Sequence, residues 1–163
     1  GLVQDGVVAQ DGVQGGELWK LREKIPLALQ TQGKVFKYDL SMATESMYEL
    51  VETMRSRLRP RYPDAKVFGY GHLGDGNLHL NITAPADTDP AILDEIEPFV
   101  YEWTAERKGS VSAEHGVGVM KTGAIHLSKS GEMLALMRKI KEIYDPNAIL
   151  NPYKMLPPSS AAQ

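Results

Sequence analysis

The sequence predicts an α+β domain in which a ferredoxin-like antiparallel sheet carries helices on one face and is followed by a C-terminal helical segment. Three observations support this class. From residue 34 to residue 113 the pattern runs strand, helix, strand, strand, helix, strand, which is the split βαβ order. Of the 163 residues, 42% are hydrophobic and 24% are charged, as expected for one globular domain with a substantial core. Residues 114–163 add a further helical pattern and a tail.

The first elements follow from apolar periodicity and from prolines. From Gly15, apolar residues recur at three- and four-residue steps, which predicts a helix that Pro26 kinks. Residues 35–40 are rich in aromatic and branched side chains and predict a strand. Helical spacing then predicts a second helix that ends near Leu58, and residues 66–71 form a small strand before a glycine-rich turn.

The later elements are predicted in the same way. Residues 78–83 alternate apolar and polar side chains, which indicates a strand with one face on a core and the other free for chemistry. Pro90 opens a third helix at a first-turn position, and Pro98 is expected to disturb its middle. Residues 110–112 predict a short strand. A fourth helix spans residues 133–143, and its apolar side chains indicate packing rather than a binding groove.

Composition excludes several classes of function. The 18 Lys and Arg residues against 21 Asp and Glu residues give a net charge of −3, so nucleic acid is not an expected partner. The absence of Cys excludes disulfides, thiolate metal sites and a cysteine nucleophile. No membrane span, signal peptide or nucleotide-binding fingerprint is present. Because the chain begins with Gly1 and not Met, we expect it to be part of a longer protein.

The segment from His72 to His79 links two predicted strands and carries an imidazole at each end. If Gly71 pairs near Leu80, the two histidines become cross-strand partners on one face. Their Cβ atoms would then lie about 5 Å apart, close enough for the two imidazoles to share a divalent ion. Two glycines in between allow a tight connection with positive φ. The alternative is a glycine-rich turn flanked by two unrelated surface histidines, and the hairpin alone does not decide between them.

A second segment places a carboxylate beside a third imidazole, at Glu114 and His115. Two histidines and one carboxylate make a three-ligand site with open positions, which suits a catalytic metal ion better than a structural one. His115 would then be free to act as an acid or base. Taken alone, such a segment is most often a surface turn, and its weight comes from its coincidence with the first segment.

Two cationic side chains provide a third indication of a functional site. Lys37 lies in the middle of a predicted strand among apolar neighbours, where a charge needs a partner, and Arg22 lies on the first helix. The functional interpretation is capture of a carboxylate by Arg22 and Lys37. The alternative is a solvated face with ordinary ion pairs.

At these residues the sequence resembles the C-terminal domain of FAD-linked oxidases. The resemblance rests on three segments. These are residues 69–81, which contain both histidines of the first motif, residues 109–118 with Glu114 and His115, and the C-terminal segment Ile-Leu-Asn-Pro-Tyr-Lys at residues 149–154. Residues 36–41 and 102–104 are similar to those members that oxidise D-2-hydroxyglutarate to 2-oxoglutarate. The resemblance covers essentially residues 1–163.

The resemblance implies a role for each matching residue. It implies metal ligands at His72, His79 and Glu114, a general base at His115, and substrate contacts at Arg22, Lys37, Asn81 and His115. It also implies that Asn151 and Lys154 border the flavin. The position four residues after Arg22, where a hydroxyl side chain is expected to contact substrate, is Pro26.

The resemblance also implies cofactors and partners. FAD is expected to be bound mainly by an N-terminal domain that is absent from this chain, so the fragment alone is expected to be inactive. A divalent metal ion, with zinc favoured by the ligand set, is the second cofactor. The substrate is a small 2-hydroxy diacid. An electron acceptor is required, for which electron-transfer flavoprotein is a candidate, and the location is mitochondrial if the source is eukaryotic.

Three alternatives stay open at this point. The first is a D-lactate or glycolate dehydrogenase of the same family, which needs only one carboxylate site. The second is a metal-dependent hydrolase in which the two histidines and Glu114 activate water. The third is a ferredoxin-like binding module without catalytic activity.

Overall fold

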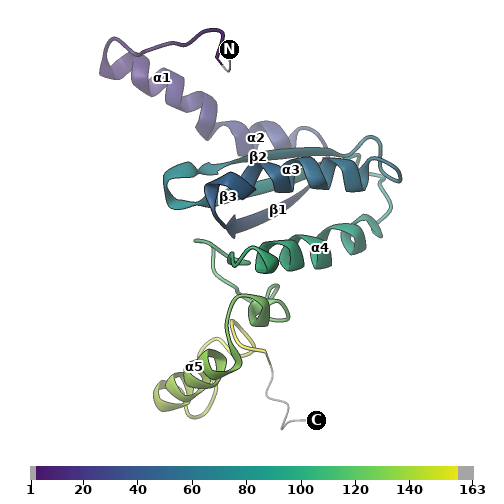
Figure 1. Cartoon of the computed structure of the whole chain (residues 1–163). Helices are drawn as coiled ribbons and strands as arrows, with labels where there is room; N and C mark the ends of the chain where they lie inside the picture. Colours follow the sequence, from purple (N-terminus) through teal and green to yellow (C-terminus); the bar gives the residue numbers. More distant parts are fainter. Residues whose placement is uncertain (1–2, 158–163) are drawn as a thin grey trace.

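The computed structural model describes residues 3–157 and contains a three-stranded antiparallel sheet surrounded by helices (Figure 1). The strands have the spatial order β1-β3-β2 and are β1 (Lys34–Ser41), β2 (Lys66–His72) and β3 (Asn77–Ala84). The helices are α1 (Gly12–Glu23), α2 (Ile25–Gln30), α3 (Thr44–Leu58), α4 (Ile92–Glu106) and α5 (Gly131–Tyr144), with 3-10 turns at Leu73–Asp75 and Ile125–Leu127. The predicted α+β class is confirmed.

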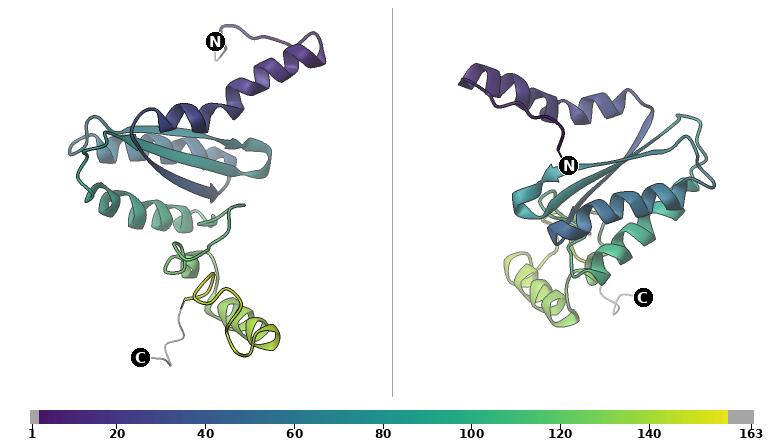
Figure 2. Two further views of the ribbon diagram at one scale, coloured as in Figure 1. Left: turned by 180° about the vertical axis from the view of Figure 1, so that it is seen from behind. Right: turned by 45° about the horizontal axis from the view of Figure 1, so that its top comes forward.

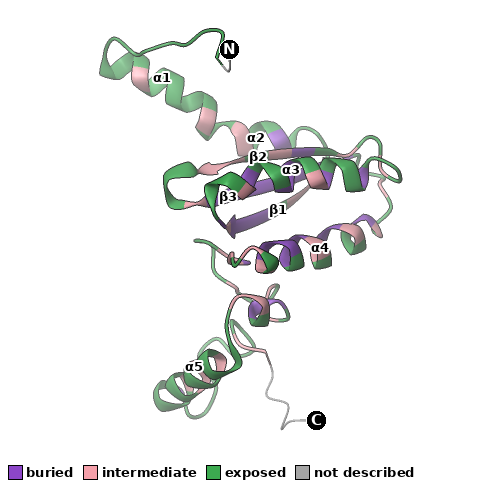
Figure 3. Ribbon diagram, in the orientation of Figure 1, coloured by how far each residue is buried: buried purple, intermediate pink, exposed green. Residues whose placement is uncertain are grey.

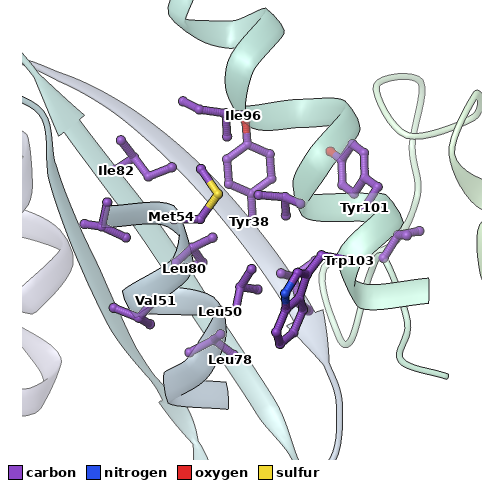
Figure 4. Close-up of a cluster of buried hydrophobic side chains, with 14 of the residues drawn as sticks. Tyr38, Leu50, Val51, Met54, Leu78, Leu80, Ile82, Ile96, Tyr101 and Trp103 are labelled. Atoms are coloured by element: carbon purple, nitrogen blue, oxygen red, sulfur yellow. The ribbon is translucent and has the colours of Figure 1, made fainter. Parts of the chain in front are cut away.

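Helices α3 and α4 cover one face of the sheet and bury the core against it (Figure 4). The apolar spacing of α3 predicted this helix, and the buried side chains follow that spacing: Met47, Leu50, Val51, Met54 and Leu58. From the strands, Leu40, Leu80 and Ile82 are fully buried on the same side. Each fully buried side chain of this size stabilises the fold by about 1.5–3 kcal/mol, so the sheet and these two helices carry most of the stability.

The predicted fourth strand does not form. Ser110 makes one isolated antiparallel bridge with Ser41 at the edge of β1, and the ladder ends there. Beyond the bridge the chain turns: the amide of Val111 donates to Ser128 Oγ at 2.9 Å, and the amides of Glu114 and His115 donate to the Asp39 side chain. A continuing strand would pair these amides with carbonyl oxygens instead. The four-stranded ferredoxin-like sheet is therefore incomplete in the described residues.

Proline has different effects in two helices. The N-terminal helical run is divided at Lys24 into α1 and α2, and Pro26 lies in the first turn of α2, so a break in this run is confirmed. Pro98 was expected to disturb its helix, but α4 continues through it from Ile92 to Glu106. Pro98 and Asp94, whose carbonyl loses its usual donor, are both exposed. Water can therefore hydrate that carbonyl and reduce the cost of the lost hydrogen bond.

Helices α1 and α5 contain no buried residue, unlike α3 and α4 (Figure 3). They extend from opposite sides of the sheet and its two covering helices (Figure 2). The predicted helix at the α5 position is confirmed, but its expected packing is not found within residues 3–157, because Leu136 and Ile140 are 58% and 49% exposed. In the same part of the chain, no helix has the length and apolar character needed to cross a bilayer.

Two glycines of one motif should respond differently to substitution. In Gly71→Ala the new Cβ would lie 2.2 Å from the carbonyl oxygen of Asn77 on the neighbouring strand, whereas at Gly74 nothing lies within 4 Å. We expect Gly71→Ala to lower the free energy of unfolding by about 1–3 kcal/mol, as overpacking typically does, because the backbone must move. Gly74→Ala is the matched control and should change it little. Urea unfolding of both variants checks this, and equal effects would contradict the register of the hairpin.

Candidate functional site

The face of the sheet opposite the core carries polar side chains. Residues of β3 alternate, so Asn77, His79 and Asn81 point away from the core while Leu78 and Leu80 point into it. The neighbouring strands add to this face: Asp39 and Tyr70 lie opposite His79, and Lys37 lies opposite Asn81. The predicted strand with one chemical face is therefore present, and β3 is buried along its whole length.

The two histidines of the first motif share a face, although their predicted pairing is wrong. Gly71 pairs with Leu78 and not with Leu80, so His72 is opposite Asn77 and His79 is opposite Tyr70. The shift is two residues, and a strand has a period of two, so both imidazoles remain on one side. Their ring centroids are 5.4 Å apart. The connection is shorter than expected because only residues 73–76 lie between the strands.

That connection uses one of its two glycines in a left-handed conformation. Gly76 has φ +65° and follows the 3-10 turn, whereas Gly74 does not have a positive φ. Gly76 therefore turns the chain back into β3, and the prediction of positive φ holds at this position alone.

Three imidazoles surround one carboxylate oxygen. The Nε2 atoms of His72, His79 and His115 lie 3.5, 3.3 and 3.6 Å from Glu114 Oε1. The rings of His79 and His115 are stacked, with centroids 5.4 Å apart. These residues come from the end of β2, the middle of β3 and the loop after α4. The tertiary structure thus joins the two motifs that the sequence separates by more than thirty residues.

This cluster offers nitrogen and oxygen donors that could hold a divalent metal ion. Asp39, His79, Glu114 and His115 each present one ligand atom, and these atoms all lie within 4.8 Å of one another. His72 adjoins the group. Its Nε2 lies between Arg22 Nη2 at 3.3 Å and Glu114 Oε1 at 3.5 Å.

Asp39 is the site residue that the sequence interpretation missed. It is 2% exposed, and its Oδ2 accepts hydrogen bonds from the amides of Glu114 and His115, each at 2.8 Å. Its Oδ1 accepts from Asn77 Nδ2 at 2.6 Å. The signal was available, since a carboxylate between Tyr38 and Leu40 inside a predicted strand needs partners as much as Lys37 does.

The electrostatics of the cluster follow from burial and these contacts. Burial alone raises the pKa of Asp39, but the hydrogen bonds from His115, Glu114 and Asn77, together with the charge of His115, outweigh it and hold the pKa below its ordinary value. Burial lowers the pKa of His79, although the nearby carboxylates of Asp39 and Glu114 oppose the shift. At neutral pH the site therefore contains an ionised Asp39 and a neutral His79.

A cavity of about 300 Å³ opens beside the cluster and is lined by Arg22, Pro26, Lys37, Tyr38, Tyr70, His72, His79, Asn81, Glu114 and His115. Seven predicted metal, base and substrate residues thus line one cavity. Arg22 donates to the carbonyl of Gly71 at 3.3 Å and lies 5.5 Å from the centre of the Tyr70 ring. Neither Arg22 nor Lys37 forms an ion pair with a carboxylate within residues 3–157.

The cavity contains unused hydrogen-bonding capacity. Asn81 is 2% exposed, and its Nδ2 donates to the carbonyl of His79 at 3.2 Å, but its Oδ1 has no hydrogen-bond partner within residues 3–157. Pro26 lines the cavity without a hydroxyl, as its sequence position indicated. Tyr70, which the sequence interpretation did not select, carries a hydroxyl in the same wall. A buried acceptor without a partner is uncommon and is consistent with a ligand site.

Asn151 and Lys154 lie elsewhere. They line a separate cavity with residues of α5, and Lys154 Nζ donates to Asn151 Oδ1 at 2.8 Å. The described residues do not bring them into the histidine cluster. Their predicted position beside the flavin stays a prediction.

Comparison with known proteins assigns this chain to a family. The model for FAD linked oxidases, C-terminal domain, matches residues 1–155. D-2-hydroxyglutarate dehydrogenase, mitochondrial, from Arabidopsis thaliana is 56% identical over 159 residues, which are 98% of this chain and 28% of the relative. The proteins of the same name from Bos taurus and Rattus norvegicus are each 53% identical over 96% of this chain, covering 28% and 29% of their own lengths. The chain therefore spans less than a third of these relatives.

Proposed function

The chain belongs to the C-terminal domain family of FAD-linked oxidases, and from this premise we propose that the intact protein is a flavin- and metal-dependent dehydrogenase that oxidises D-2-hydroxyglutarate to 2-oxoglutarate. One observation carries the proposal: a cavity with a histidine-carboxylate cluster on one side also contains two cations that no carboxylate of the described chain neutralises. The names of the relatives are consistent with this substrate. Their names also support a mitochondrial location.

The donor set fits a divalent metal ion. His72, His79 and Glu114 would hold it, because the Nε2 atoms of both imidazoles converge on Glu114 Oε1. Imidazole and carboxylate ligands with open positions favour zinc in a catalytic site. When bound, the ion would polarise the 2-hydroxyl group of the substrate and lower its pKa. Asn81 Oδ1, buried and without a partner, is available to orient that end of the substrate.

Removal of one imidazole tests the metal site. We expect His79→Ala in the intact protein to lose most of its bound zinc, because His79 is the most buried of the three imidazoles around Glu114. His126→Ala is the matched control, since His126 is exposed on the turn Ile125–Leu127 and lies outside the cluster. Metal content after dialysis, measured by elemental analysis, decides the matter. Equal zinc content in both variants would remove the proposed site.

The reaction requires a flavin that other parts of the protein hold. The matching family is FAD-linked, this chain contains no nucleotide-binding fingerprint, and it spans 28–29% of the relatives. When bound, the flavin would supply the acceptor for the hydride at C2 of the substrate. The electrons must then pass to a further acceptor, for which electron-transfer flavoprotein is our candidate. The residues of this chain bind and orient the hydroxy acid and remove its proton.

Two cations in one cavity favour a diacid over a monoacid. Arg22 can donate two parallel hydrogen bonds to a carboxylate, and Lys37 supplies a second positive charge. D-2-hydroxyglutarate has one carboxylate beside the 2-hydroxyl and a second at the far end of the molecule. D-lactate has only the first, so a D-lactate dehydrogenase would leave one cation without a partner. The diacid is therefore the better match to the charges of the cavity.

The substrate proposal predicts a selective effect of charge removal. In Lys37→Met we expect kcat/KM for D-2-hydroxyglutarate to fall about 10- to 100-fold, as expected for a charged hydrogen bond worth about 1.5–3 kcal/mol, while turnover of D-lactate changes less. Lys34→Met is the matched control on the same strand, because the Lys34 ammonium donates instead to the carbonyl of Thr88 at 3.0 Å. Steady-state kinetics with both substrates give the comparison. An equal loss on both substrates would argue against the diacid.

We assign proton removal to His115. Its side chain is 63% exposed in the cavity wall, and its Nε2 faces the same space as the cluster, so it can take the proton of the substrate hydroxyl at that nitrogen. Glu114 is directed to the imidazoles of His72 and His79. His115 is therefore the more accessible base of the pair.

The role of His115 is tested in the intact enzyme. His115→Ala should reduce turnover of D-2-hydroxyglutarate about 10²- to 10⁴-fold, the usual range for a general base, with zinc content near that of the wild type. Metal content, melting temperature and the pH dependence of kcat are measured on the same preparation. Loss of zinc together with activity would make His115 a ligand. A lower melting temperature with normal turnover would make it a packing residue.

A further inference from the structure

We propose that Asp39 is a positioning residue that holds the Glu114-His115 segment against the sheet and directs the Nε2 atoms of His79 and His115 toward the reaction centre. The inference deepens the proposed function, because it explains how the metal ligands and the base are oriented, and it rests in part on that function. It draws on two independent groups of contacts. One group is made by backbone amides and the other by imidazole rings.

The first group fixes the segment. The amides of Glu114 and His115 both donate to Asp39 Oδ2 at 2.8 Å, and the amide of Ala113 donates to the Asp39 carbonyl at 3.2 Å. Consecutive amides that converge on one carboxylate oxygen fix the direction of the backbone between them. The Glu114 side chain is thereby placed over His79. No other side chain in the described residues accepts from these two amides.

The second group fixes the rings. His79 Nδ1 lies 3.8 Å from Asp39 Oδ1, and His115 Nδ1 lies 4.0 Å from Asp39 Oδ2. The opposite nitrogens of both rings face Glu114 Oε1. Both rings therefore lie between two carboxylates, with Asp39 on the Nδ1 side and Glu114 on the Nε2 side, and a metal ion held at Nε2 would leave the Nδ1 proton facing Asp39.

Asp39 is better suited to positioning than to ligation, although it belongs to the group of convergent donors. It is 2% exposed, and both of its oxygens already accept strong hydrogen bonds, Oδ1 from Asn77 and Oδ2 from the two amides. Ligation by Asp39 would require the loss of at least one of these bonds. A buried donor left without its acceptor is destabilising.

The first test measures hydrogen exchange of the Glu114 and His115 backbone amides by NMR in the wild-type protein without metal. We expect both amides to be protected, because each donates to the buried Asp39 carboxylate at 2.8 Å. Exchange of both at the rate of exposed loop amides would overturn the inference, and this result does not depend on whether the protein binds zinc or whether a variant folds.

The second test uses Asp39→Asn, with Asp75→Asn as the matched control, since Asp75 is exposed in the turn beside the first histidine. We expect Asp39→Asn to weaken zinc binding 10- to 100-fold, the usual effect of losing an outer partner of a metal-binding histidine, and to change the visible spectrum of the cobalt-substituted protein. Asp75→Asn should do neither. Unchanged zinc affinity and cobalt spectrum in Asp39→Asn would contradict the inference.

The two proposals fail in distinguishable ways. If the wild-type protein binds no zinc, the proposed metal site is wrong, whereas the exchange of the Glu114 and His115 amides still decides the role of Asp39. If the wild type binds zinc and Asp39→Asn binds it equally well, only the role of Asp39 is wrong. If Asp39→Asn does not fold, the amide exchange of the wild type remains the deciding result.

Discussion

The carboxylate of Asp39 joins a strand of the sheet to a loop that lies 75 residues further along the chain. A buried carboxylate is costly unless its oxygens are filled with hydrogen bonds, and here two amides and one side-chain amide fill them. The amides that satisfy Asp39 belong to the two residues that complete the histidine cluster. The hydrogen bonds that satisfy the buried charge of Asp39 therefore also assemble the site. It also explains why the chain leaves the edge of β1 after a single bridge instead of adding a strand.

The sheet serves stability on one face and chemistry on the other. Alternation along β3 directs leucine and isoleucine side chains into the core under α3 and α4, while His79 and Asn81 occupy the opposite side. Because the core fixes the strand register, it also fixes the positions of the side chains that carry the chemistry. The rigid part of the protein thus holds His79, and the loop after α4 supplies Glu114 and His115.

The cavity is lined by imidazole and carboxylate groups and by two cations. The histidine cluster and Glu114 supply lone pairs, and Arg22 and Lys37 supply positive charge that no carboxylate of the described chain neutralises. Arg22 comes from α1, a helix without buried residues, and its contacts with Gly71, His72 and Tyr70 join that helix to the site. A ligand with a carboxylate and a neighbouring hydroxyl would satisfy both kinds of group. The exposed apolar side chains of α5 take no part in it.

The sequence by itself determined the α+β class, the three strands, the end of α3 near Leu58 and seven of the residues that line the cavity, because these depend on local periodicity and on residue chemistry. It also indicated that charged and imidazole side chains would share one face, since alternation in a strand is local. Only the tertiary structure decided the hairpin register, the loss of the fourth strand and the role of Asp39. The register of β2 against β3 depends on the turn that residues 73–76 form between the two strands. The Oδ2 atom of Asp39 accepts from backbone amides, and a backbone amide has no signature in the sequence. Local patterns therefore identified the groups that carry chemistry, whereas their mutual orientation came from long-range hydrogen bonds.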